Sequence, residues 1–178
     1  GWSQKNLLEW YDIANRVGQP LFVGEGSIDA GAWRYPQIFE EPSYALEEIR
    51  IYLKILKFAQ PLSILQWQLT SDYSVLSGGG IYGNDDKLKP TQRFFNLKQL
   101  GKTPSGLRNI PVTSNQESVT AAALGSKERG QYALHLVNKG GKRSIEVTGI
   151  PSSISAFNVY VTDQNNSFKR IKKVQVSN

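Results

Sequence analysis

The stretch "PLFVGEGS", residues 20–27, decides the fold of the first half of the chain. Leu21, Phe22 and Val23 form a short continuous apolar run, which predicts a strand covered on both faces, as in a parallel sheet. The run ends at Glu25, which has a glycine on each side. Parallel α/β folds carry functional groups at the C-terminal ends of strands, and the glycines leave room for close approach to the carboxylate. We therefore expect a functional carboxylate at the end of this strand.

Helical patterns precede and follow this strand. Residues 3–18 form an amphipathic helix that Ser3 can cap and Gly18 can end, because serine favours helix starts and glycine adopts the left-handed stop. A second helix is predicted over about 43–59, and a third from residue 90 or 91 to 101. The expected inward-facing residues are Leu7, Trp10, Tyr11, Ala14 and Val17 in the first helix, and Leu46, Ile49, Tyr52, Leu53 and Leu56 in the second.

A second strand is predicted at residues 62–71, so the order of elements is helix, strand, helix, strand, helix. A strand–helix–strand unit with buried strands implies parallel pairing and a right-handed crossover. Two parallel strands are too few for a stable sheet, because their edges leave backbone groups unpaired. This half is therefore predicted to be an α/β piece of a barrel or of an open doubly wound sheet.

The second half of the chain has a different pattern, with strands only. Prolines and a glycine within residues 104–111 mark the junction, so the predicted domains are residues 1–103 and 104–178. About six strand-like runs follow, one of them at residues 143–150, and their spacing predicts an antiparallel β-sandwich. His135 falls in the alternation of one run and is interpreted as a partly exposed structural histidine.

The composition excludes several classes of function. The chain has 178 residues, of which 39% are hydrophobic and 20% are charged, as in soluble globular proteins. It has no cysteine and one histidine, which argues against a thiolate or histidine metal site and against a Ser/His triad. No metal or cofactor is predicted, and no apolar run is long enough to span a bilayer. The net charge is +6. The one cluster of positively charged residues is interpreted as a solvated strand face and not as a nucleic-acid site. That cluster comprises Lys169, Arg170, Lys172 and Lys173.

Polar and aromatic side chains are expected together where the two strands of the first half end. The candidate residues are Glu25, Trp33, Tyr35, Trp67, Asp72 and Tyr73. Aromatic rings can cover the apolar faces of sugars while polar groups bind the hydroxyls. A central carboxylate such as Glu25 can act as the nucleophile on an anomeric carbon. The simpler alternatives are a charged residue at a strand end, aromatic residues that belong to the core, and loop residues that fix their own loop.

Three motifs resemble parts of the clan A glycoside hydrolases. "QPLFVGEGS", residues 19–27, resembles their seventh-strand motif, in which a glutamate is the nucleophile, and Glu25 matches it. "LSILQWQLTSDYS", residues 62–74, looks like strand eight, where an aromatic residue that matches Trp67 forms the floor of the sugar subsite. "RFFNLKQLGKTPSGLRNIPVTS" followed by "YALHLVNKG" is similar to the last barrel helix and the β-sandwich of glucosylceramidase-like and xylosidase-like members. The resemblance implies the end of a (β/α)8 barrel, a C-terminal β-sandwich and retaining cleavage of β-glycosidic bonds.

The chain also departs from this family. The family's acid/base is a glutamate at the end of strand four, usually preceded by asparagine, and this chain has no Asn-Glu pair. It also has no room for strands one to six. Retaining chemistry needs two carboxyl groups roughly 5 Å apart, so we expect that this chain alone is inactive. The expected partners are a carbohydrate substrate and the missing N-terminal part of the barrel, and by analogy the protein is expected to be secreted or periplasmic.

Two other functions remain open at this point. The chain can be a non-catalytic carbohydrate-binding or degenerate glycosidase-like protein, or a basic surface-interaction protein without sugar chemistry. The glycine-rich stretch 77–86 lacks the Gly-Lys-Ser/Thr of a phosphate-binding loop. Its acidic and amide oxygens can bind calcium, although ordinary turn chemistry explains them more simply.

Overall fold

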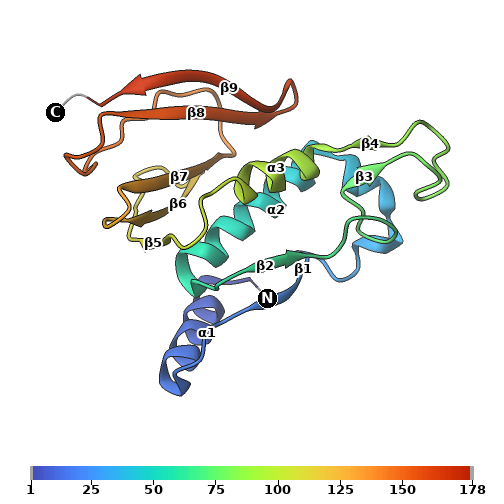
Figure 1. The fold of residues 1–178 in the computed structure, drawn as a ribbon. Coiled ribbons are helices and arrows are strands. Elements are labelled where there is room, and N and C mark those ends of the chain that lie inside the picture. Colours follow the sequence, from blue (N-terminus) through green and yellow to red (C-terminus); the bar gives the residue numbers. More distant parts are fainter. Residues whose placement is uncertain (1, 177–178) are drawn as a thin grey trace.

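A computed structural model describes residues 2–176 (Figure 1). Helix α1 (Gln4–Val17) begins where expected, because the Ser3 hydroxyl accepts a hydrogen bond from the Asn6 amide at 3.2 Å. It ends at Gly18, whose φ of 64° is left-handed. The first predicted helix is therefore confirmed at both ends.

Strands β1 (Val23–Gly26) and β2 (Ile64–Gln66) form a parallel pair, as the sequence predicts. Val23 lies opposite Ile64 and Gly26 lies opposite Gln66, with an irregularity between these two positions. The second strand is much shorter than the predicted run of residues 62–71. The pairing places the C-terminal ends of both strands at the same edge.

Between the two strands, the chain forms two 3₁₀ turns and a long helix. The elements are η1 (Ala32–Arg34), η2 (Pro36–Glu40), α2 (Pro42–Lys54) and η3 (Ile55–Ala59). The last of these has π-helical hydrogen bonding and continues directly from α2, so the predicted helix over 43–59 is confirmed. A hairpin of β3 (Leu76–Ser77) and β4 (Lys89–Pro90) then leads to α3 (Gln92–Gly101), the third predicted helix.

One face of the β1–β2 pair is covered and the other is open. Ile51, Tyr52 and Ile55 are buried on the side of α2 and η3, and Val23 and Ile64 pack against them. On the other side, Phe22 and Leu65 are 55% and 50% exposed, so the prediction that this strand is covered on both faces is wrong for residues 2–176.

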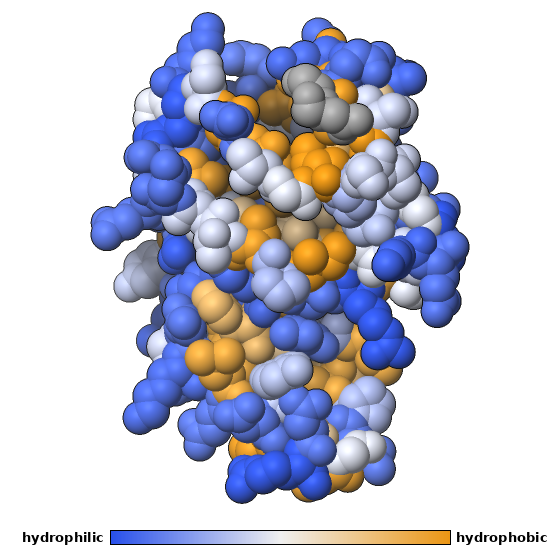
Figure 2. Space-filling model, turned by 90° about the vertical axis from the view of Figure 1, so that its left-hand side faces the viewer, coloured by the Kyte–Doolittle hydropathy of each residue, from blue (hydrophilic) through white to orange (hydrophobic). Residues whose placement is uncertain are grey.

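Helix α1 buries less than its amphipathic pattern predicts. Leu7 is buried in the core, whereas Trp10 and Val17 are exposed. The helix contacts the rest of the described chain mainly through η3, and this contact leaves part of its apolar side exposed. Figure 2, which views the molecule from the left-hand side of Figure 1, likewise shows apolar patches within a mainly hydrophilic surface.

The second half consists of antiparallel strands in two sheets. The first sheet contains β5 (Arg108–Ile110), β6 (Val119–Ser126) and β7 (Gln131–Asn138), and the second contains β8 (Ala156–Asp163) and β9 (Asn166–Gln175). Four of the six expected runs are therefore strands, the run at 110–114 overlaps β5 only at Ile110, and the run at 143–150 is not a strand. Strands β6 and β7 pack on α2 through Ala122, Val137 and Leu53. Strands β8 and β9 lie above α3 in Figure 1 and contact it.

His135 occupies the structural position that its strand pattern predicts. Its Nε2 atom lies 2.8 Å from the Thr103 hydroxyl, which also donates a hydrogen bond to the Leu100 carbonyl. Burial lowers the pKa of the His135 imidazole. The residue thus links β7 to the end of α3.

The predicted (β/α)8 barrel would need more strands than the described residues contain. The described residues form a parallel pair with flanking helices and an antiparallel second half, and they contain no closed barrel. The barrel and the domain division at residues 103 and 104 therefore stay predictions. None of the helices within residues 2–176 has the length and apolar character of a membrane span.

Candidate functional site

Glu25 and Trp67 lie at the edge where the two parallel strands end. Glu25 is the penultimate residue of β1, and Trp67 follows β2 directly. The Trp67 amide donates a hydrogen bond to the Gly26 carbonyl at 3.0 Å, which fixes the two strand ends against each other. The structure therefore brings together the two residues on which the sequence prediction depends.

The alternation of side chains places Trp67 on the open face. Gln66 points toward α2, because its amide oxygen contacts the Tyr52 hydroxyl and its amide nitrogen lies 3.4 Å from Glu48. Neighbouring residues of a strand point to opposite faces, so Leu65 and Trp67 point away from α2. Both are exposed, and Trp67 keeps 43% of its surface accessible.

Glu25 is accessible to solvent near the end of β1. A side chain at Gly26 would point at the Tyr52 hydroxyl, but the strand is irregular between Val23 and Gly26, so alternation does not give the direction of the Glu25 side chain. Glu25 is exposed, and within residues 2–176 its carboxylate has no hydrogen-bond or ion-pair partner. The carboxylate is therefore available to a bound molecule.

The two glycines beside Glu25 have different structural reasons. A Cβ at Gly26 would lie 2.7 Å from the Tyr52 hydroxyl and 2.9 Å from the Leu65 carbonyl. A Cβ at Gly24 would meet only a ring carbon of Phe22 at 3.8 Å, which is an ordinary contact. Gly26 is thus required by packing within the protein, and only Gly24 remains for the predicted role of admitting a ligand.

Trp33 and Tyr35 are exposed on the segment that follows β1, residues 27–41, here called the first loop. They are 50% and 70% exposed, and the Arg34 guanidinium lies 5.5 Å from the centre of the Trp33 ring. The loop itself is anchored by Ala32 and Phe39, which are buried. The rings therefore extend from a fixed backbone.

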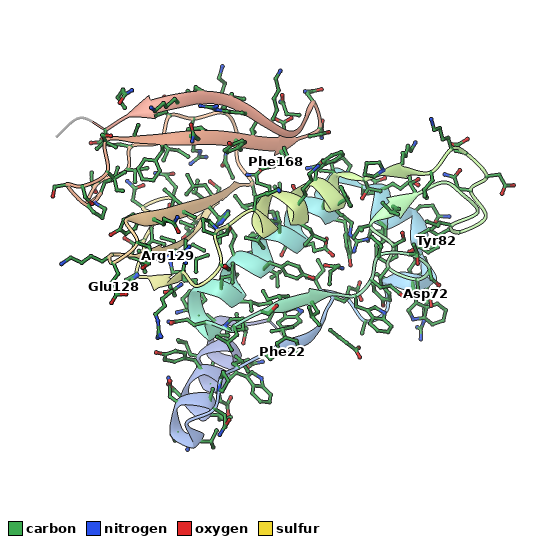
Figure 3. All side chains as sticks on the ribbon, in the orientation of Figure 1. Phe22, Asp72, Tyr82, Glu128, Arg129 and Phe168 are labelled. Atoms are coloured by element: carbon green, nitrogen blue, oxygen red, sulfur yellow. The ribbon has the colours of Figure 1, made fainter. Side chains whose placement is uncertain are left out.

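Asp72 and Tyr73 lie on the segment that follows β2, residues 67–75, here called the second loop. Asp72 is exposed near Tyr82, at the end of the molecule that carries the β3–β4 hairpin (Figure 3). Tyr73 is buried, with its ring 5.2 Å from that of Phe39. Tyr73 thus joins the two loops to each other, and its predicted contact with a substrate stays a prediction.

A buried ion pair beneath the two loops was not predicted from the sequence. Glu48 of α2 accepts hydrogen bonds from Nε and Nη2 of Arg93 of α3, at 2.9 and 2.8 Å. The helix pattern predicted Leu46, Ile49, Tyr52, Leu53 and Leu56 on the inner side of α2 and did not include Glu48. No signal in the sequence connects Glu48 to Arg93, which follows 45 residues later.

The buried tyrosines near this pair remain neutral. Burial raises the pKa of both Tyr44 and Tyr52 far above the ordinary range, and the nearby Glu48 carboxylate raises it further. Burial also raises the pKa of Tyr82. The Tyr52 and Tyr82 hydroxyls form hydrogen bonds, whereas Tyr44 contributes the packing of its ring against Phe39 and Arg93.

The glycine-rich stretch forms the β3–β4 hairpin beside the loops. Tyr82 stacks on Phe39 with ring centres 5.8 Å apart, and its hydroxyl accepts a hydrogen bond from the Ser74 amide at 2.7 Å. The Ser77 hydroxyl donates to the carboxylate of Glu40. No group of three or more acidic or histidine side chains that could hold a metal ion is present in residues 2–176. The hairpin therefore supports the loops by turn and aromatic contacts.

A search of solved structures finds a similar fold in the crystal structure of a GH30 endoxylanase from Clostridium papyrosolvens C71. The TM-score is 0.71 at 14% sequence identity, and the match covers 99% of this chain and 42% of that one. No protein family and no curated protein matches the sequence. The likeness shows a shared fold, over less than half the length of the endoxylanase chain.

Proposed function

We propose that this chain is the C-terminal part of a glycoside hydrolase that cleaves β-glycosidic bonds with retention, and that Glu25 is its nucleophile. The observation that carries the proposal is the parallel β1–β2 pair, which ends in an accessible carboxylate and an accessible indole at one edge. The likeness to a GH30 endoxylanase over 99% of the chain adds support and favours xylan as the substrate class.

The reaction assigns separate tasks to the residues of the site. Glu25 attacks the anomeric carbon while the glycosidic C–O bond breaks and the leaving oxygen takes a proton from the acid/base. Water, deprotonated by the same acid/base, then hydrolyses the covalent glycosyl-enzyme and frees Glu25. Trp67 presents a flat apolar ring to the face of the sugar in the adjoining subsite. Trp33 and Tyr35 offer further rings along the first loop, and Asp72 offers an acceptor for sugar hydroxyls on the second.

The acid/base of this reaction comes from outside the chain. A retaining enzyme needs its second carboxyl group about 5–5.5 Å from the nucleophile. In this proposal β1 and β2 are the last two strands of a (β/α)8 barrel, and the exposed Phe22 and Leu65 face the barrel interior that earlier strands complete. Those strands also supply the acid/base. Export of the complete enzyme is part of the proposal.

The test compares the chain alone with the chain completed by the polypeptide encoded upstream of it. We expect no hydrolysis of xylohexaose or of an aryl β-xyloside by the chain alone, and hydrolysis with retained configuration by the completed protein. Glu25→Gln in the completed protein should abolish turnover, whereas Glu41→Gln, an exposed carboxylate at the far end of the first loop, should not.

Two results would separate the proposal from its alternative. Xylohexaose binding without turnover by the completed protein would favour a non-catalytic carbohydrate-binding protein. Turnover that survives Glu25→Gln would show that another residue is the nucleophile.

A further inference from the structure

Arg93 uses all of its donor nitrogens while fully buried. Its side chain is 0% exposed, and the Glu48 side chain that it pairs with is 2% exposed. Besides its two bonds to Glu48, Arg93 donates through Nη1 to the carbonyls of Tyr73 at 3.1 Å and Ser74 at 2.7 Å. The guanidinium therefore holds the backbone of the second loop directly.

The same guanidinium also holds the first loop. Its central carbon lies 4.7 Å from the ring centre of Phe39 and 5.3 Å from that of Tyr44. Phe39 lies in the first loop and Tyr44 at the start of α2. A cation over an aromatic face is attracted by the ring, and more strongly when water is excluded. Arg93 thus contacts both loops that carry the candidate sugar-binding residues.

Glu48 extends this contact to the ends of the strands. One of its oxygens lies 3.4 Å from the amide nitrogen of Gln66, the last residue of β2. The Gln66 amide oxygen contacts the Tyr52 hydroxyl, which donates to the Gly26 carbonyl at 2.7 Å. A continuous chain of polar contacts therefore runs from the second loop to the residue that follows Glu25.

Stability alone does not account for a charged pair at this place. Removing two charges from water costs free energy that their attraction seldom exceeds, and well-packed apolar replacements are often as stable or more so. Arg93 is also the second residue of α3, where the helix dipole opposes a cation. What arginine adds is a rigid planar set of donors that fixes several acceptors at defined angles.

We propose that Arg93 and Glu48 are positioning residues that set the two loops relative to the strand ends of the site. This inference rests on the proposed function, because that function assigns sugar binding to the two loops. In the absence of the pair, the core remains folded while Trp33, Tyr35 and Asp72 lose their fixed places around Glu25.

The test replaces the pair with apolar residues of similar size, as Glu48→Leu together with Arg93→Met. Hydrogen exchange is measured on the chain at the Tyr35, Trp67 and Ser74 amides, all of which are hydrogen-bonded. We expect exchange at these amides at least about tenfold faster than in the wild type, because local opening of the loops requires less free energy than global unfolding of the chain. The β6–β7 amides should exchange at the wild-type rate.

A matched control removes the ion pair of Glu47 and Arg50 on the same helix, where Glu47 bonds to Arg50 and to Lys139 and not to either loop. Glu47→Leu together with Arg50→Met should leave exchange in both loops unchanged. If the apolar double variant at 48 and 93 does not fold, Arg93→Lys provides the same readout, because lysine keeps the charge but cannot hold the two loop carbonyls and Glu48 together.

The completed protein provides a second readout. Loss of positioning should raise KM for xylohexaose about tenfold and change kcat much less, because binding is weakened while Glu25 is kept. Wild-type exchange in both loops of a folded Arg93 variant would overturn the positioning role. Fast loop exchange in a protein whose wild type neither binds nor cleaves xylohexaose would overturn the proposed function and leave the positioning role standing.

Discussion

Replacing Gly26 with alanine tests why a glycine follows Glu25. The added Cβ would lie 2.7 Å from the Tyr52 hydroxyl, 2.9 Å from the Leu65 carbonyl and 3.0 Å from a methyl carbon of Ile64. The Leu65 carbonyl belongs to the backbone of β2, so it cannot move without moving the strand. The Tyr52 hydroxyl is itself held by its bond to the Gly26 carbonyl. The substitution must therefore displace the strand pair or the helix.

Gly24→Ala is the matched control, because it adds the same methyl group on the other side of Glu25. Its Cβ would meet only a Phe22 ring carbon at 3.8 Å, and neither glycine has a left-handed φ. Both substitutions restrict the unfolded chain and so gain about 0.4–1 kcal/mol. Overpacking costs about 1–3 kcal/mol and applies only at Gly26. We expect Gly26→Ala to be the less stable variant by about 1–3 kcal/mol, the full overpacking cost, since the entropic gain is common to both.

Urea unfolding followed by circular dichroism measures this difference. The midpoint should fall for Gly26→Ala with an unchanged slope, and the melting temperature should fall by about 2–4 °C for each kcal/mol lost. Adding Tyr52→Phe should recover part of the loss, because it removes the nearest contact atom. Equal stability of the two alanine variants would refute the packing argument. It would leave approach of a substrate as the reason for both glycines.

Three further predictions concern charges in the described part of the chain. Glu25→Gln should change the free energy of unfolding by less than about 0.5 kcal/mol, because the side chain is exposed. Glu48→Gln breaks a buried pair and should lower the free energy of unfolding by about 3–5 kcal/mol. Urea unfolding that shows the same loss of stability for both variants would contradict the structure. Burial lowers the pKa of His135, so the unfolded state binds more protons below about pH 6.5, the ordinary value, and stability should decline as pH falls through that range. The same pH series on His135→Gln should lose this decline, and a variant that keeps it would assign the decline to another group. The hydrogen bond from Arg50, with a weaker one from Lys139, lowers the pKa of Glu47 to about 2 from an ordinary 4.5, so its stabilising contribution is complete above pH 4.5 and is lost as pH falls toward 2. In a carbon-13 NMR titration Arg50→Met should raise the pKa of Glu47 more than Lys139→Met does, and the reverse order would refute this assignment.

The sequence by itself determined the three helices and the parallel pairing of the two strands in the first half. Apolar residues spaced three and four apart, with Ser3 before them and Gly18 after them, are enough to predict α1, because helix capping depends on residues next to the helix. The apolar run before Glu25 and the helix after it predict a parallel pair, because parallel neighbours need a crossover connection and a helix is the usual one. The meeting of Glu25 and Trp67 at one edge follows from that pairing.

Only the tertiary structure decided what supports the site and which surfaces remain open. The pairing of Glu48 with Arg93 depends on how α2 and α3 pack. The sequence does not indicate that two residues so far apart along the chain form such a contact. The strand predicted at 143–150 did not form, and Trp10 and Val17 stayed exposed, although both follow regular patterns. A pattern states which side of an element should be buried, but burial also requires a neighbouring surface, and that surface is supplied by tertiary packing.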